Sequence, residues 1–406
     1  METISHVQPN PAEAALADRI TQAAARNEPL LVQGNGTKAG MLRPVQAERV
    51  VSTAGDSGIV LYSPQELIIS ARAGTPLSVV EAALAEKGQH LIAEPPDLSV
   101  LLGLTDRPQT IGGVTATNLS GPRRVAWGAV RDHVMGIRAV TGRGEVIHSG
   151  GRVLKNVTGL DLCKLFTGSH GTLGVITEVT LKVLPAPEQT GTLAIPGLDA
   201  AAAVGALSAA LGSPFSVSAA AWLPKEAAER VPELAAFGTG VALARIEDFA
   251  ASVTYRTEKL AAQLALAGTV ILDDATSRAV WRAVRDVRPL AAEPGDAVWR
   301  VSVRPSAGAG VLTGLTKGHG MTGYLDWGGG LVWLTGPATE AAHLAIEAAA
   351  THAGGQWTLM RAPDSLRSAV RVVPDEPAPL ARITRRVKAA FDPKGIMNPG
   401  RITAGL

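Results

Sequence analysis

A run of small and hydroxyl-bearing residues at positions 110–121 constrains this chain more than any other feature. It reads Thr-Ile-Gly-Gly-Val-Thr-Ala-Thr-Asn-Leu-Ser-Gly. Few structural turns need so many such residues in succession. A backbone that lies against a large planar ligand does need them, because it must offer N–H donors without side-chain collisions. We therefore expect a cofactor beside this segment.

Two further glycine-bearing segments lie in the first half of the chain. Residues 34–38, Gly-Asn-Gly-Thr-Lys, follow a short apolar strand and could place backbone N–H groups and a lysine around a pyrophosphate. A plain hairpin turn explains the same residues. Residues 168–174, Gly-Ser-His-Gly-Thr-Leu-Gly, lead directly into an alternating strand. A tight strand entry is the alternative there.

Several other kinds of site are disfavoured. Residues 34–39 resemble a Rossmann fingerprint, but Pro44 lies where the following helix would continue. The chain contains no Walker A loop, no His-Glu-x-x-His helix and no nucleophile elbow. Cys163 is the only cysteine, so a cysteine-ligated iron–sulfur cluster cannot form here. If electrons pass through a cluster, another polypeptide carries it.

Length and charge limit the organisation and the partners. A chain of 406 residues exceeds what one hydrophobic core usually serves, so we expect two domains. A formal net charge of +2 gives no reason to expect nucleic acid or an anionic membrane as a partner. Residues 1–10 lack a leader pattern, and no long apolar run follows. We expect a cytoplasmic protein that could reach the inner membrane peripherally through partners.

Periodicity predicts strands and helices mixed along the whole chain. Helices are expected at 11–26, 76–88 and 339–350, and strands at 30–32, 48–51, 67–71, 137–148 (a hairpin), 175–184, 298–304 and 330–334. The alanine runs 200–203 and 219–221 are interpreted as helix material. The pattern breaks at residues 185–187, where we place a domain boundary.

In this order, the three segments resemble the FAD-binding domain of the vanillyl-alcohol-oxidase (PCMH-type) flavoproteins. Residues 391–401, Phe-Asp-Pro-Lys-Gly-Ile-Met-Asn-Pro-Gly-Arg, are similar to the C-terminal signature of that family. Residues 112–124 and 326–330 are most similar to the FAD-binding subunits of bacterial glycolate oxidases. The resemblance implies an α+β fold: a two-subdomain FAD-binding domain over 1–187, an α+β cap domain over 188–375, and a C-terminal helix and tail over 376–406 that returns to the first domain.

The resemblance also implies which residues bind FAD. The first segment would surround the pyrophosphate, the second would run beside the flavin and its ribityl chain, and the third would approach the adenine. The cofactor-binding residues predicted in this way are Gly34, Asn35, Gly36, Thr37, Lys38, Thr110, Ile111, Gly112, Gly113, Thr117, Ser120, Gly121, Gly174, Val175 and Ile176. Asn398 would return to this domain, or it simply caps the last helix.

Some relatives attach FAD through a histidine in the first segment. Thr37 and Lys38 stand there instead, so non-covalent FAD is expected, with His133 and His170 left open as attachment sites. Oxidation of a 2-hydroxy acid at a flavin needs a cation for the carboxylate and a base for the hydroxyl proton. Relatives carry histidine-rich cap segments for this step, whereas the corresponding strand expected at 324–333 and residues 358–367 contain no histidine. No metal site is expected.

These features predict an FAD subunit of a glycolate oxidase complex, beside a sister FAD subunit that oxidises glycolate and an iron–sulfur subunit that takes the electrons. One alternative is a self-sufficient dehydrogenase for a small 2-hydroxy acid such as D-lactate, with Arg300 or Arg285 on the carboxylate and an unidentified base. Strand alternation puts Arg300, Ser302 and Arg304 on one face. A solvated sheet edge is the competing interpretation. A third possibility is a structural subunit whose flavin site has lapsed.

Overall fold

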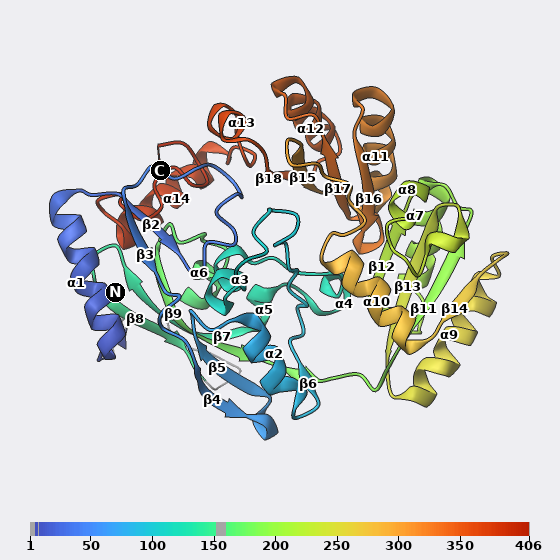
Figure 1. Cartoon of the computed structure of the whole chain (residues 1–406), viewed down its shortest axis with the longest axis horizontal. Coiled ribbons are helices and arrows are strands. Elements are labelled where there is room, and N and C mark those ends of the chain that lie inside the picture. The colour runs from blue at the N-terminus through green and yellow to red at the C-terminus, as the bar shows by residue number, and fades with distance from the viewer. Residues whose placement is uncertain (1–4, 7, 152–159, 406) are drawn as a thin grey trace.

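The computed structural model describes residues 5–6, 8–151 and 160–405. The fold is α+β, with one sheet and its helices from the first half of the chain and a larger sheet from the second half (Figure 1). In the first half the elements are β1 (Ser5–His6), α1 (Pro11–Arg26), β2 (Leu30–Gln33), β3 (Arg49–Ser52), β4 (Ile59–Ser63), η1 (Pro64–Glu66), β5 (Ile68–Arg72), α2 (Leu77–Ala85), β6 (Gln89–His90), α3 (Ile111–Thr117), α4 (Arg124–Trp127), α5 (Val130–His133), β7 (Val134–Thr141), β8 (Val146–Gly150), α6 (Leu162–Phe166), β9 (Gly174–Lys182) and β10 (Leu184–Pro185).

The N-terminal domain contains two subdomains. In the smaller one, β2 and β3 pair in parallel, and α1 packs against them through Ile20 and Ala23. In the larger one, an antiparallel six-stranded sheet has the order β1-β8-β7-β9-β5-β4, and α2, α3 and α6 supply its core contacts. Helix α1 begins as the sequence predicts, because Asn10 and Glu13 form a reciprocal capping box with Pro11 at the first helical position.

The cap domain is built on one antiparallel eight-stranded sheet. Its order is β14-β11-β13-β12-β16-β17-β15-β18, and its helices pack on it around one hydrophobic core. The elements are β11 (Gln189–Pro196), α7 (Ala200–Leu211), β12 (Ala219–Leu223), α8 (Lys225–Ala228), η2 (Ala235–Phe237), β13 (Val241–Asp248), α9 (Ala250–Leu264), β14 (Val270–Leu272), α10 (Asp274–Arg285), β15 (Ala297–Ser302), α11 (Pro305–His319), β16 (Thr322–Asp326), η3 (Trp327–Gly329), β17 (Leu331–Gly336), α12 (Glu340–His352), β18 (Gln356–Arg361) and α13 (Asp364–Ala369).

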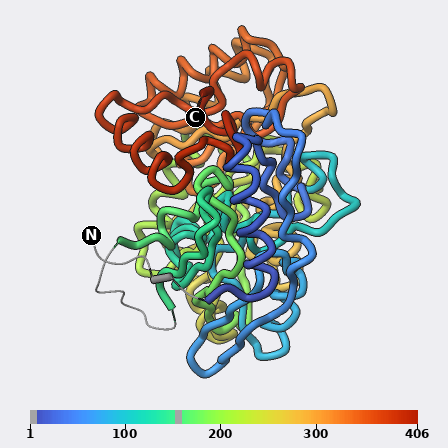
Figure 2. The backbone as a smooth tube through the Cα atoms, turned by 90° about the vertical axis from the view of Figure 1, so that its left-hand side faces the viewer, coloured from blue at the N-terminus to red at the C-terminus, as the bar shows by residue number. Residues whose placement is uncertain are grey.

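The end of the chain returns to the N-terminal domain. After α14 (Ala378–Phe391), the backbone N–H of Leu30 donates to Ile396 O at 2.8 Å, and Asn398 N–H donates to Leu30 O at 3.0 Å. Figure 2 shows the red C-terminal segment beside the blue N-terminal one. The first sheet ends at Lys182 and the second begins at Gln189. The exact domain limits 1–187, 188–375 and 376–406 remain predictions.

Three local predictions are wrong. Ala219, Ala220 and Ala221 form the central strand β12 rather than a helix, because side chains this small let a fully buried strand pack closely on both faces. Residues 324–333 are not one strand: β16 and β17 form a hairpin around η3, whose Gly328 and Gly329 have positive φ. Arg304 leaves the strand to cap α11 and is exposed.

Within the part of the chain that the structure describes, no helix is both long and apolar enough to cross a membrane.

Candidate functional site: a cavity between three glycine segments

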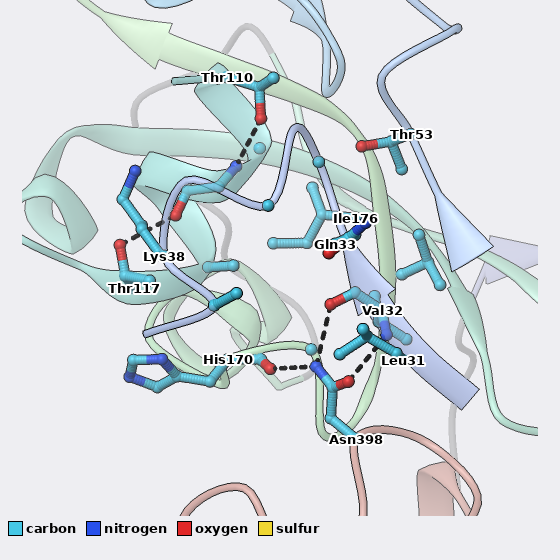
Figure 3. Close-up of a pocket in the computed structure, with 18 of the residues that line it drawn as sticks. Leu31, Val32, Gln33, Lys38, Thr53, Thr110, Thr117, His170, Ile176 and Asn398 are labelled. Carbon is cyan, nitrogen blue, oxygen red and sulfur yellow. Dashed lines mark hydrogen bonds between the residues drawn. The ribbon is translucent and has the colours of Figure 1, made fainter. Parts of the chain in front are cut away.

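The three glycine-bearing segments meet at one cavity in the N-terminal domain. The cavity is partly open to solvent, and with that open part included it contains about 770 Å³ of empty space. Figure 3 shows the first segment, the start of α3 and the entry to β9 arranged around it. Its walls consist of Leu31, Val32, Gln33, Gly34, Asn35, Gly36, Thr37, Lys38, Ala39, Thr53, Thr110, Gly112, Gly113, Ala116, Thr117, His170, Gly171, Gly174, Val175, Ile176, Asn398 and Arg401.

The first segment needs glycine for two different reasons. A Cβ on Gly34 would lie 2.3 Å from Thr110 Oγ1, so only a bare backbone can pass there. Gly36 has φ +71°, in the left-handed region that favours glycine. Asn35 Nδ2 donates to Pro108 O at 2.8 Å, which ties this segment to the approach of the second.

The second segment is not a loop throughout, because residues 111–117 form helix α3. Thr110 caps it by accepting from Gly113 N–H at 3.2 Å. A Cβ on Gly112 would lie 2.8 Å from Ala73 O, so this glycine also allows close packing on the sheet. Gly112, Gly113, Ala116 and Thr117 of α3 line the cavity, which the sequence could not show.

Three predicted site residues are not on the cavity wall. Ile111 is 1% exposed and belongs to the core of the larger subdomain. Ser120 Oγ accepts from Val130 N–H at 3.0 Å, and Gly121 O accepts from the indole N–H of Trp327 at 3.1 Å. Ser120 and Gly121 therefore lie where the N-terminal domain meets the cap. The other predicted cofactor residues are all at the wall.

The third segment turns sharply before it enters β9. A Cβ on Gly174 would lie 2.5 Å from Val140 O. Gly171 has φ +73°, and a Cβ there would lie 2.8 Å from Asn398 Nδ2. The close approach of a second backbone therefore explains Gly174, whereas a positive φ and the side chains of Asn398 and Val32 explain Gly171. His170 lines the cavity, whereas His133 is not among its lining residues.

Asn398 joins β2, the strand that leads into the first segment, to the third segment. Its Oδ1 accepts from Val32 N–H at 2.7 Å, and its Nδ2 donates to Val32 O at 3.1 Å and to His170 O at 2.8 Å (Figure 3). It does not cap the last helix, because the C-cap of α14 is Asp392. Through this amide, the C-terminal tail contributes to the wall of the cavity.

The charges at the wall are all cationic. Burial, partly offset by Asp97, lowers the pKa of Lys38 to about 8, and Lys38 Nζ donates to Gln109 Oε1 at 3.0 Å. Burial and the nearby Arg401 lower the pKa of His170 to about 3, so that imidazole is neutral. No carboxylate stands among the lining residues that the structure describes. The wall therefore suits an anion, and its bare glycine backbone fits the pyrophosphate of a dinucleotide.

At the interface with the cap, two arginines lie over the ring of one indole, Trp327. The guanidinium carbons of Arg124 and Arg300 lie 4.8 Å and 4.9 Å from the Trp327 ring. Arg300 is not at a solvated sheet edge, because β15 lies between β17 and β18. Burial and Arg124 lower the pKa of Arg300 to about 10. Burial raises the pKa of the neighbouring Asp326 to about 7.

Arg285 has a different environment. Its Nε and Nη2 donate to Asp286 at 2.8 and 3.0 Å, so its charge is already paired. Next to it, two further ion pairs cross between the domains: Arg245 Nη1 donates to Glu94 Oε1 at 2.9 Å, and Arg123 Nη2 donates to Glu247 Oε1 at 2.7 Å. These pairs could not be predicted from local sequence patterns, because each joins residues more than a hundred positions apart. Among the described residues, no group of three or more metal-binding side chains is present.

This fold and cavity define a PCMH-type FAD-binding flavoprotein. Residues 7–150 match the FAD binding domain family, and residues 377–402 match the C-terminal domain of FAD linked oxidases. The chain is 34% identical over 393 residues to the glycolate oxidase subunit GlcE of Escherichia coli, covering 97% of each protein. It belongs to the family of FAD-linked oxidoreductases that includes this subunit, and its cofactor is FAD.

Other relatives match over the FAD-binding half. Glycolate oxidase subunit GlcD of Bacillus subtilis is 32% identical over 175 residues, which is 43% of this chain and 36% of that protein. D-lactate dehydrogenase of Archaeoglobus fulgidus is 31% identical over 169 residues, 41% of this chain and 36% of that protein. Among solved structures, 4-ethylphenol oxidase from Gulosibacter chungangensis has a TM-score of 0.70 at 14% identity, covering 97% of this chain and 88% of its own. These structures share the fold.

Proposed function

We propose that this chain is the FAD-binding subunit of a glycolate oxidase (glycolate dehydrogenase) complex. It would take part in the two-electron oxidation of glycolate to glyoxylate, with a sister FAD subunit and with an iron–sulfur subunit that receives the electrons. The full-length similarity to GlcE carries this proposal, since the matches to GlcD and to D-lactate dehydrogenase cover less than half of the chain. When bound, FAD supplies the acceptor for a hydride.

The residues proposed to hold FAD are those of the cavity. Gly34 to Lys38 would surround the pyrophosphate, Thr110, Gly112, Gly113 and Thr117 would run along the ribityl chain and flavin, and Gly174 to Ile176 would approach the adenine. Ile111, Ser120 and Gly121 would act indirectly, by fixing α3 and the turn that meets Trp327. We propose non-covalent binding, for which His170 is the histidine to examine, because it lines the cavity.

A second candidate function rests on Arg300 and Asp326. The Arg300 guanidinium makes no hydrogen bond or ion pair with a carboxylate among the described residues, which leaves it available for the carboxylate of a 2-hydroxy acid. Asp326 has its pKa near 7, where a general base works best, and Trp327 links both residues to the turn at Gly121. This arrangement favours a self-sufficient dehydrogenase in which Asp326 takes the hydroxyl proton.

Anaerobic mixing separates the two functions. The purified chain loaded with FAD is mixed with glycolate or with D-lactate, and the flavin absorbance is followed. The subunit proposal expects no rapid bleaching by the chain alone and bleaching when the sister subunit is present. Rapid bleaching by the chain alone, lost in Arg300→Met and slowed about 10²–10⁴-fold in Asp326→Asn, would replace it with the dehydrogenase. Flavin stoichiometry near zero in the intact complex would instead indicate a structural subunit.

A further inference from the structure

Two buried arginines from distant parts of the sequence hold the same stretch of backbone. Arg401 donates from Nη2 to Lys38 O at 2.7 Å and from Nη1 to Ala39 O at 3.2 Å and Arg43 O at 3.0 Å. Arg367, in α13, donates from Nη1 to Ala39 O at 3.2 Å. Residues 38–43 continue directly from the first glycine segment. Both arginines therefore support the backbone on which that segment depends.

The two arginines differ in how their charge is compensated. Arg367 pairs with Asp364, Nη2 to Oδ1, at 2.5 Å. Arg401 is 7% exposed and makes no ion pair with any described residue. A buried cation without a counter-ion costs free energy unless something else supplies the negative charge. Arg401 lines the cavity, whereas Arg367 does not.

The rest of the wall offers no counter-ion for Arg401. Among the described lining residues the only charged side chains are Lys38 and Arg401, from opposite ends of the sequence, and His170 between them is neutral. Two cations without a carboxylate complement a dianion. The pyrophosphate of a dinucleotide carries that charge and reaches a guanidinium in well-formed, charge-assisted hydrogen bonds.

We propose that Arg401, together with Lys38, supplies the positive charge that binds the pyrophosphate of FAD, and that this contact closes residues 396–401 over the cavity. Arg401 thus both binds the ligand and holds residues 396–401 closed over the cavity. The segment is already attached at Leu30 through two backbone hydrogen bonds, and at Val32 through Asn398. The inference rests on the proposed placement of FAD in this cavity.

Thermodynamic coupling between FAD binding and closure of residues 396–401 has a second consequence. If FAD binds more tightly when the segment is closed, FAD must favour the closed segment by the same factor. Hydrogen exchange at the amides of Leu30, Val32 and Asn398, which donate the bonds that attach the segment, should therefore slow when FAD is added. Adenosine, which lacks the phosphates, should slow it much less.

The test is equilibrium binding to the apoprotein, with FAD titrated directly and ADP and adenosine used as competitors. Arg401→Met removes the positive charge and the planar guanidinium, and Arg401→Lys keeps the charge alone. Arg367→Met is the matched control, because Arg367 also donates to Ala39 O. We expect Arg401→Met to weaken FAD and ADP about 10- to 100-fold, the loss of a charge-assisted hydrogen bond, and to leave adenosine unchanged. Arg401→Lys should recover part of the loss. Arg367→Met should lower the melting temperature and leave the ratio of ADP to adenosine affinity unchanged.

Equal losses for ADP and adenosine in Arg401→Met, or the same ADP-selective loss in Arg367→Met, would overturn the proposal and leave Arg401 as a support for the loop. If Arg401→Met does not fold, Lys38→Met and the salt dependence of wild-type FAD binding decide. An ADP-selective loss in Lys38→Met and weaker FAD binding at high salt support the dianion site, and their absence refutes it. Wild-type apoprotein that binds no FAD would instead refute the flavoprotein assignment itself.

Discussion

Asn398 and Val32 are bonded twice, with the Asn398 amide accepting from the Val32 N–H at 2.7 Å and donating to its carbonyl at 3.1 Å. The side chain thus imitates a neighbouring strand for β2, although 366 positions separate the two residues. Through its further bond to His170 O, it connects β2, which leads into the first glycine segment, to the third glycine segment. The shape of the cavity therefore depends on a residue from the far end of the chain.

Replacing that amide should weaken both the fold and the cofactor site. Asn398 is 3% exposed, and Asn398→Ala removes the partner of the Val32 N–H and C=O, so we expect the free energy of unfolding to fall by about 1–3 kcal/mol. Urea denaturation of the apoprotein measures it. Asn35→Ala, which removes one exposed side-chain bond, is the control and should cost less than about 1 kcal/mol. Equal stability of Asn398→Ala and wild type would contradict the bridging role.

Gly34 and Thr110 should show a steric coupling. A methyl group at Gly34 would lie 2.3 Å from Thr110 Oγ1, and that hydroxyl is held by its bond to Gly113 N–H. Gly34→Ala should therefore lose most of its bound FAD, and adding Thr110→Ala should restore part of it. Flavin content after gel filtration reports both. Gly40→Ala, where the nearest contact is 3.8 Å, should retain wild-type flavin content. No rescue in the double variant would argue against this contact.

The buried carboxyl of Asp326 should make stability depend on pH. Its pKa in the folded protein, about 7, lies above the usual 3.8. Below about pH 4 the carboxyl group is protonated in both the folded and the unfolded chain, so its burial does not reduce the free energy of unfolding. Between pH 4 and 7 the unfolded chain loses the proton first, so stability falls as pH rises, and the cost is constant above pH 7. Asp326→Asn should therefore stabilise the protein at pH 8, on the order of 1–4 kcal/mol, and barely at pH 4. Thermal melts of Asp326→Asn and wild type at pH 4 and pH 8 measure this difference. An equal increase in melting temperature at both pH values would contradict the raised pKa of Asp326.

The ion pair between Arg245 and Glu94 should stabilise the contact between the domains. The Arg245 side chain is 2% exposed and lies within ion-pair distance of both Glu94 and Glu247. Arg245→Met leaves these two buried carboxylates to share Arg123, so it should cost about 3–5 kcal/mol. The double variant with Glu94→Leu should recover much of that loss. Lys225→Met, which breaks the exposed pair with Glu229, is the control and should cost no more than about 1 kcal/mol. Denaturant titrations compare the three, and a similar cost for both single variants would reject the buried pair as a domain contact.

Local sequence patterns predicted much of the N-terminal domain. The capping residues Asn10 and Glu13 indicated α1, and the alternation before Pro185 indicated β9, because both signals depend on neighbours in the chain. The cluster of small residues at 110–121 indicated a cofactor site for the same reason. Its helical start was missed, since glycines at positions 112 and 113 oppose helix formation unless tertiary packing selects it.

Long-range contacts could not be predicted in this way. Arg401 and Arg367 act on carbonyls more than three hundred positions away, and no spacing rule connects them. The stacking of Arg300 on Trp327 likewise depends on the order of strands in the sheet, which strand alternation alone does not give. The helix prediction for the alanines of β12 was wrong because alanine has a high intrinsic helix propensity, and tertiary packing overrides that propensity here.

A crystal structure of the FAD-loaded chain tests the central claim most directly. The account predicts one FAD whose pyrophosphate lies against residues 34–38 and Arg401, whose adenine lies near Gly174 to Ile176, and which has no covalent bond to His170. A flavin bound elsewhere, or the three glycine segments filled by their own side chains with FAD absent, would contradict it.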